Sequence, residues 1–220
     1  PSAEQIAGLK PDIVIMDADW AKMNKDLLKD LDKAKIKYAA LNRPKWAVLG
    51  QYLDKLGALS GRSKEAAQTL LLSEKSLSKS DIRSGKTEKM RVFVVAGADY
   101  STCAPDSWGA RLIDATGARI LTDSKGTRVQ DFSWYIFYGP QKLADNAKNV
   151  DVIITLKNIG RGVPSVSRES IVNDPMFKNT PAVKNGRVWE MDESDLMLPS
   201  LVRLDSSLVK CWQLISYKTK

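Results

Sequence analysis

The stretch that decides the fold is Asp12-Ile13-Val14-Ile15-Met16-Asp17-Ala18-Asp19-Trp20. Its first half is a short continuous apolar run, which is typical of a parallel strand buried on both faces. Apolar residues then recur at helical spacing over 21–35, and a second apolar run follows at Tyr38–Leu41. Strand, helix and strand in this order predict a βαβ unit with a parallel sheet and a right-handed crossover.

The same alternation returns in the second half of the chain. Apolar runs at 90–96, 149–155 and 188–191 predict three more strands, and the spacing of apolar residues at 107–116 and 200–217 predicts two helices. The chain is therefore expected to be an α/β protein built from two halves.

A long helix predicted over 62–80 separates the halves, with Ser60 as its expected N-cap. The charged, turn-rich segment that follows it is typical of a boundary. We therefore predict three parts, which cover residues 1–60, 61–89 and 90–220.

Composition limits the kinds of function that the chain can have. Among 220 residues, 34 Lys and Arg stand against 26 Asp and Glu, which gives a net charge of +8. Such an excess favours an anionic partner, such as nucleic acid, a phospholipid surface or a small anionic ligand, although solvated lysine-rich helices explain it equally well. No apolar run approaches the ~18 residues that a membrane-spanning helix needs.

The chain has no histidine. This excludes Ser-His-Asp and Cys-His nucleophile systems, other histidine acid–base catalysis, and any imidazole metal site. Cys103 and Cys211 are too far apart in sequence for a metal knuckle and too few for a disulfide scaffold, and whether they pair is not decided by the sequence. Ordinary catalysis is therefore not expected, and we predict no enzyme.

Four segments, taken in order, resemble one family. They are Glu-Gln-Ile-Ala-Gly-Leu-Lys-Pro-Asp-Ile-Val-Ile at 4–15, Leu-Gly-Ala-Leu-Ser-Gly-Arg at 56–62, Asn-Val-Asp-Val-Ile-Ile at 149–154, and Asn-Asp-Pro-Met-Phe with Pro-Ala-Val-Lys-Asn-Gly-Arg-Val at 173–188. Together they are similar to the substrate-binding proteins of ABC importers for cobalamin, haem and ferric siderophores. The resemblance implies two Rossmann-like lobes joined by a long inter-lobe helix.

The resemblance departs at its start, because members of the family place a strand, a helix and a strand before the Leu-Lys-Pro-Asp segment. The first part of the chain, 1–60, is therefore expected to be a partial N-lobe, as in a fragment or a shortened relative. Residues 61–89 are then the inter-lobe helix and linker, and 90–220 the C-lobe.

Candidate ligand residues follow the predicted strands, at the sheet edge where open α/β folds bind ligands. Aromatic rings can stack on a flat ligand, and arginine or lysine can bind an anion. Each also has a structural interpretation, such as a capping carboxylate or a packed indole. The candidates are Asp17, Trp20, Arg43, Lys45, Trp46, Tyr100, Trp108 and Arg161.

The expected ligand is an anionic, partly flat metal complex such as a ferric siderophore, haem or a cobalamin-like molecule. Arg161 from one lobe and Arg43 or Lys45 from the other are expected to hold it. Since histidine is absent, the metal should arrive already chelated, and we predict no protein-bound cofactor or metal. By resemblance, Glu193 is an exposed acidic residue that contacts the membrane permease.

The function predicted from these features is an extracytoplasmic solute receptor, periplasmic or anchored to the outer face of the cytoplasmic membrane as a lipoprotein. It would deliver the metal complex to an ABC permease. The alternative is a basic α/β nucleic-acid-binding protein, which the charge permits but no recognised nucleic-acid module supports. An enzyme of bilobal chelatase-like fold is a third interpretation, weakened by the missing histidine.

Overall fold

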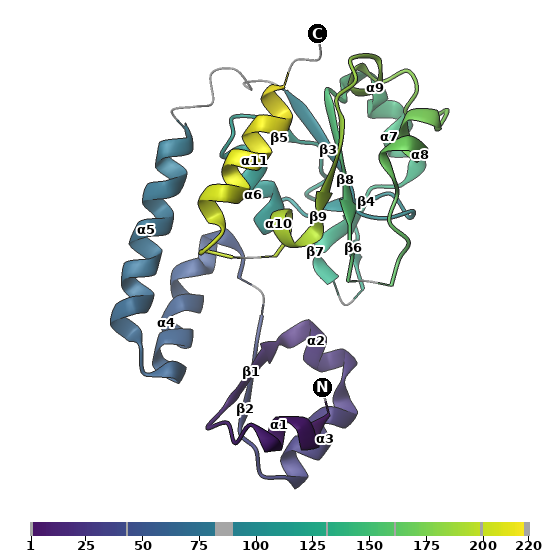
Figure 1. Cartoon of the computed structure of the whole chain (residues 1–220). Helices are drawn as coiled ribbons and strands as arrows, with labels where there is room; N and C mark the ends of the chain where they lie inside the picture. Colours follow the sequence, from purple (N-terminus) through teal and green to yellow (C-terminus); the bar gives the residue numbers. More distant parts are fainter. Residues whose placement is uncertain are drawn as a thin grey trace. The chain divides into compact units, whose positions relative to one another are not determined.

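The computed structural model describes residues 2–42, 44–81, 90–130, 132–160, 162–198 and 200–217, with the side chains of 79–81 excepted (Figure 1). The chain forms two compact units. Unit 1 comprises Pro1–Pro44 and Gln130–Phe132, and unit 2 comprises Lys45–Val129 and Ser133–Lys220. Each unit is described by itself.

Unit 1 contains the predicted βαβ arrangement. Its two strands pair in parallel, from Val14 opposite Tyr38 to Asp17 opposite Leu41. The elements in chain order are α1 (Ala3–Gly8), β1 (Val14–Asp17), α2 (Ala18–Met23), α3 (Lys25–Lys33) and β2 (Tyr38–Leu41).

Two details of unit 1 differ from the sequence prediction. The helix expected over 21–35 is two helices, because the chain breaks at Asn24, whose side-chain amide donates to the Trp20 carbonyl at 2.8 Å. Ile15 is 38 % exposed, so β1 is not buried on both faces. A two-stranded sheet covered by three short helices leaves apolar positions open where a larger sheet would cover them.

Unit 2 is built on a four-stranded parallel sheet in the order β5-β3-β8-β9, which contains the three strands expected in the second half. Strands from residues 101–137 form a second, three-stranded sheet in the order β4-β7-β6. The pairing of β4 with β7 is antiparallel. The strands are β3 (Arg91–Val95), β4 (Ser101–Cys103), β5 (Arg119–Ile120), β6 (Arg128–Val129), β7 (Phe132–Phe137), β8 (Val152–Lys157) and β9 (Val188–Asp192).

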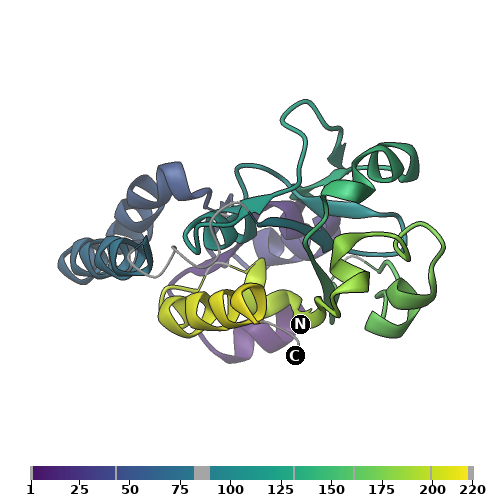
Figure 2. The ribbon, with the colours of Figure 1, turned by 90° about the horizontal axis from the view of Figure 1, so that it is seen from above.

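Helices cover both faces of the parallel sheet. Figures 1 and 2 show α6 and α11 on one face, and α7, α8 and α9 on the other. The helical elements of unit 2 are η1 (Trp46–Val48), α4 (Leu49–Ser60), α5 (Ser63–Asp81), α6 (Trp108–Asp114), α7 (Pro140–Asn146), η3 (Ala147–Asn149), α8 (Arg168–Asn173), α9 (Pro181–Lys184), α10 (Glu193–Leu196) and α11 (Leu204–Ser216).

The core between the sheet and the second helix layer is apolar and partly aromatic. Phe93, Ile153 and Phe177 are fully buried there. The Phe93 ring lies 5.3 Å from the Tyr138 ring and 6.4 Å from the Phe177 ring, in tilted arrangements that aromatic pairs prefer. This core fixes the strand ends from which the candidate binding loops leave.

The predicted long helix is present as α5, but its surroundings differ from the prediction. Ser60 is the last residue of α4 rather than an N-cap, and Gly61 ends that helix in the left-handed conformation, with φ +70°. Helix α4 packs against α5, and both belong to unit 2. The compact units therefore divide at Pro44, whereas the predicted parts divide at residue 60.

Gly57 makes the close packing of α4 against α5 possible. A Cβ atom there would lie 2.9 Å from both the Ala66 Cβ and the Ser63 Cα. We expect Gly57→Ala to lower the free energy of unfolding by about 1–3 kcal/mol, because backbone atoms cannot move aside cheaply.

The matched control is Gly50→Ala in the same helix, where a Cβ would meet only a flexible methyl group of Leu70 at 3.3 Å. That variant should be neutral or up to ~1 kcal/mol more stable, since alanine is the better helix former. Urea denaturation of the two variants measures the difference. Equal stabilities would contradict the close α4–α5 contact.

Candidate functional site

In unit 1, the turn after β1 is organised by Asp17. Its carboxylate accepts hydrogen bonds from the backbone N–H groups of Asp19 and Trp20, both at 3.0 Å, and so caps α2. Asp19 forms an ion pair with Lys22 at 2.7 Å. The capping residue of α2 is therefore Asp17. The structure shows Asp17 in a structural role and Trp20 half-buried, and ligand binding by either residue stays a prediction.

Arg43 and Arg161, the two arginines predicted to hold the ligand, lie outside the described residues. Their neighbours are described. Lys45 and Trp46 begin unit 2, and Gly160 and Gly162 flank position 161, with Gly162 at φ +69°.

In unit 2, the Asp106 carboxylate forms ion pairs with two cationic side chains. The Arg128 guanidinium donates two hydrogen bonds to its carboxylate, at 2.8 and 3.0 Å, and the Lys45 ammonium donates a third at 2.5 Å. Burial raises the pKa of Asp106, but the hydrogen bonds and charges of Arg128 and Lys45 outweigh it and hold that pKa below its ordinary value. Two cations around one carboxylate leave a net positive charge on an exposed surface.

Aromatic rings lie next to this cluster in sequence and in space. The Trp46 ring is half-buried and lies 5.2 Å from the Trp108 ring, tilted by 50°. The Arg111 guanidinium stands 5.9 Å from the centre of the Trp46 ring, which is within cation–π distance. Trp108 is only 3 % exposed, so in this structure it packs behind Trp46 and offers no open ring face.

The helix that carries Trp108 begins as predicted. The Ser107 hydroxyl accepts the backbone N–H of Ala110 at 3.2 Å, which makes Ser107 the N-cap of α6. This cap fixes the position of Asp106, one residue before it. We name Lys45, Trp46, Asp106, Arg111 and Arg128 the cationic–aromatic cluster.

Tyr100 occupies the loop after β3 in a left-handed backbone conformation, with φ +53°. Its hydroxyl donates to the Asp174 carboxylate at 2.9 Å, and its ring lies 6.0 Å from that of Phe177. Burial and then the contact with Asp174 raise the pKa of Tyr100 above its ordinary value. Tyr100 thus holds the loop after β3 to the segment after α8, and its predicted stacking on a ligand stays a prediction.

Glu193 differs from the sequence prediction. It is 6 % exposed, so the expectation of an exposed acidic side chain is wrong. One carboxylate oxygen accepts the Tyr135 hydroxyl at 2.6 Å, and the other accepts the backbone N–H of Gly160 at 2.9 Å. Next to it, Asp192 accepts the side-chain amide of Asn158 at 2.5 Å. Glu193 therefore ties β7 and α10 to the loop after β8, and its contact with a permease stays a prediction.

Neither cysteine is placed for chemistry. Cys103 and Cys211 are free thiols and fully buried, and burial raises the pKa of Cys103 and raises that of Cys211 to about 12. The Cys103 sulfur lies 3.2 Å from the Met197 sulfur. Within the described residues, no group of three or more Cys, Asp or Glu side chains is arranged to hold a metal ion.

A cavity of about 460 Å³ lies between α5 and the start of α11. The predicted ligand residues within the described part of the chain do not line it. Polar and aliphatic side chains form its walls, and none of the described lining residues is aromatic. The lining residues are Thr69, Leu72, Ser73, Lys75, Ser76, Leu201, Val202, Leu204 and Asp205. It is a groove between helices and lacks the rings and paired cations of the cationic–aromatic cluster.

Asp106, Arg111 and Arg128 are members of the cluster that the sequence prediction missed. Asp106 follows β4 and Arg128 begins β6, and both strands belong to the three-stranded sheet β4-β7-β6, which the sequence did not predict. The predicted Ser107 N-cap indicated only that Asp106, the residue before it, lies at the start of a helix.

Among the described residues, no helix is both long enough and apolar enough to cross a membrane. A family model described as "Periplasmic binding protein" matches residues 1–194. No curated protein matches the chain.

Solved structures share the fold. A possible iron-binding (periplasmic solute-binding) protein from Staphylococcus epidermidis is 18 % identical with a TM-score of 0.77, and the match covers 98 % of this chain and 80 % of that one. A periplasmic heme-binding protein from Pseudomonas aeruginosa is 20 % identical with a TM-score of 0.72, covering 98 % and 75 %. S. aureus IsdE complexed with heme is 18 % identical with a TM-score of 0.71, covering 99 % and 81 %.

Proposed function

The chain belongs to the periplasmic binding protein family, and we propose that it is the extracytoplasmic receptor of an ABC importer for an anionic metal chelate. The observation that carries the proposal is the family match over residues 1–194. Similar structures include a possible iron-binding protein and two heme-binding proteins, and they favour a ferric siderophore or haem as the ligand, with a cobalamin-like molecule as the further member of the class.

The cationic–aromatic cluster supports this ligand class. Lys45 and Arg128 supply positive charge beyond what Asp106 neutralises, and Trp46 supplies a half-buried ring beside them. Carboxylate or catecholate oxygens of a chelate match the cations, and a planar ligand matches the ring. We propose that Arg161 adds a guanidinium from the loop after β8, with Arg43, Tyr100, Trp108, Asp17 and Trp20 as the remaining candidates.

The proposed role is binding and delivery, without catalysis. The chain has no histidine, so neither an imidazole base nor an imidazole iron ligand is available. The metal would therefore be bound through the organic groups that already chelate it. The proposed partner is the permease of the importer in the membrane.

Titration followed by tryptophan fluorescence tests the proposal, because the chain has six tryptophans and Trp46 lies in the cluster. We expect quenching at micromolar concentrations by haem or by a ferric siderophore, and less quenching in Trp46→Phe. If no chelate in a panel of haem, ferric siderophores and cobalamin quenches the fluorescence at micromolar concentration, the proposed function is wrong.

Lys45→Gln tests the charge of the ligand. Removing one exposed cation that contacts an anion should cost about 1 kcal/mol of binding free energy, or roughly a fivefold loss of affinity. The affinity for cyanocobalamin, which has no net charge, should stay unchanged. An equal loss for charged and uncharged ligands would show that Lys45 acts by positioning and not by charge.

A further inference from the structure

Apolar side chains that face water gather beside the groove between α5 and α11. In the described part of unit 2, the large hydrophobic side chains with the greatest exposure are Val202 at 98 %, Leu71 at 67 % and Leu72 at 58 %. Leu72 and Val202 line the groove, and Leu71 precedes Leu72 on α5. Scattered apolar side chains at a surface carry no information, whereas a group of them on two neighbouring elements marks an interaction site.

The groove offers little to a small polar ligand. The Thr69 hydroxyl donates to the Glu65 carbonyl at 2.7 Å, and the Ser73 hydroxyl donates to the Thr69 carbonyl at 2.8 Å. Both hydroxyl protons are therefore used within α5, and most of the other lining side chains are aliphatic. An apolar side chain of a partner protein fits such walls better than a polar metabolite does.

One cation and one anion stand on opposite walls of the groove. Lys75 lies on α5 and Asp205 in the first turn of α11, and both are exposed. Neither forms an ion pair with another residue that the structure describes. Arg203 and Lys210, the cations nearest to Asp205 in the sequence, both pair with Asp195 instead.

The sequence neighbours of these two charges do not neutralise them either. Charged side chains on a helix pair over three or four positions. The residues at those distances before Lys75 are Leu71 and Leu72. The positions three and four residues from Asp205 hold only aliphatic side chains: Leu201, Val202, Leu208 and Val209. The groove thus presents two opposite charges that are each available to a partner.

This set of side chains is complementary to a copy of itself. In a dimer with twofold symmetry, each contact occurs twice, so that one surface patch must contain both members of every contact. The groove contains them, because Val202 protrudes beside a hollow with aliphatic walls, and Lys75 faces outward on the wall opposite Asp205. The lining residues carry no net charge, although the whole chain carries +8, so two copies can meet here without local repulsion.

We propose that two copies of this chain form a twofold dimer through the groove between α5 and α11. Val202 of each copy enters the groove of the other copy, and Lys75 of each pairs with Asp205 of the other. The apolar patch is small, so the dimer is weak and reversible, with a Kd above roughly 10 µM.

The proposal does not depend on the proposed function. The candidate ligand residues in the described part of the chain do not line the groove. Each copy therefore binds its own chelate, and one chelate per chain is expected in the monomer and in the dimer alike. Absence of chelate binding would leave the dimer contact standing.

Sedimentation equilibrium of the full chain at low ionic strength tests the proposal. We expect monomer at about 5 µM and mostly dimer at about 500 µM, a range that brackets weak interfaces. Val202→Glu should raise the dimer Kd about tenfold or more, because it buries a carboxylate in an apolar contact.

Exchange of the two charges tests the twofold geometry. Lys75→Glu alone and Asp205→Lys alone each place like charges opposite one another, twice in the dimer, and should raise the Kd about tenfold or more. The double variant Lys75→Glu/Asp205→Lys restores both opposite pairs. Its Kd should return to within about threefold of the unaltered protein.

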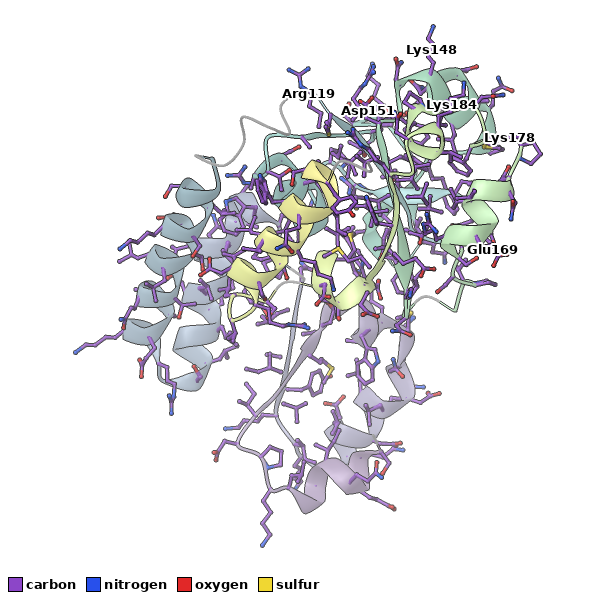
Figure 3. All side chains as sticks on the ribbon, turned by 45° about the horizontal axis from the view of Figure 1, so that its top comes forward. Arg119, Lys148, Asp151, Glu169, Lys178 and Lys184 are labelled. Atoms are coloured by element: carbon purple, nitrogen blue, oxygen red, sulfur yellow. The ribbon has the colours of Figure 1, made fainter. Side chains whose placement is uncertain are left out.

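The matched control is Lys148→Glu/Glu169→Lys, which makes the same exchange at two exposed positions. Figure 3 shows both residues on the side of unit 2 that carries α7 and α8, away from α5. This variant should dimerise as the unaltered protein does. All the substituted side chains are exposed, so each variant should remain folded by circular dichroism.

Three results would overturn the proposal. The first is a monomer at every concentration of the unaltered protein. The second is a dimer that Val202→Glu and the single charge variants leave intact, since a different surface would then form the contact. The third is a folded double variant that dimerises no better than the single ones.

Discussion

Replacing Glu193 with alanine should lower the free energy of unfolding by about 2–4 kcal/mol. The substitution removes the buried acceptor of both the Tyr135 hydroxyl and the Gly160 N–H. Each buried hydrogen bond to a charged group contributes roughly 1.5–3 kcal/mol, and losing one partner leaves the other to be desolvated without compensation. Urea denaturation measures the change as a lower midpoint with an unchanged slope.

Two further variants show whether the loss comes from these contacts. Tyr135→Phe removes one donor and should cost about 1 kcal/mol, because it leaves the carboxylate its Gly160 contact. Glu193→Gln keeps an oxygen acceptor and should be less destabilising than Glu193→Ala. Surface substitutions usually change the free energy of unfolding by no more than about 0.5 kcal/mol. If Glu193→Ala changes it by no more than this, Glu193 is a solvated side chain and its burial is wrong.

Replacing Arg161 with alanine should weaken binding of an anionic chelate roughly ten- to a hundredfold while leaving stability nearly unchanged. A guanidinium bonded to a carboxylate or another oxyanion of the ligand contributes about 1.5–3 kcal/mol in a partly dry site. Tryptophan fluorescence titration measures the affinity, and urea denaturation of the same samples measures the stability.

The matched control is Arg119→Ala, which removes the same charge at the start of β5. It should bind the chelate as the unaltered protein does. If the two variants lose affinity equally, the effect is one of net charge. If Arg161→Ala unfolds the protein, Arg161 is a structural residue and the proposed anion contact is wrong.

Local patterns were sufficient to predict much of the fold. The strand at Tyr38–Leu41 and the Ser107 cap of α6 were confirmed, because apolar runs and capping residues act over a few neighbours. The parallel pairing of β1 and β2 also follows from their short connection through helices.

Pairings between distant segments could not be predicted in this way. Strand β4 has only three residues, Ser101–Cys103, and is a strand because it pairs with β7 more than thirty positions later. The contact of Lys45 with Asp106 spans 61 positions, and nothing in either local sequence indicates it. Glu193 was expected at the surface by resemblance to the family, yet Tyr135 and Gly160 provide it with buried partners.

Native mass spectrometry tests the receptor function most directly. The protein is purified without refolding and incubated with haem, a ferric siderophore and cobalamin. We expect a complex of one protein with one anionic chelate, either retained from the cell or formed on incubation. This complex should weaken in Arg161→Ala and persist in Arg119→Ala. A spectrum that shows only the unliganded protein with every chelate would contradict the account.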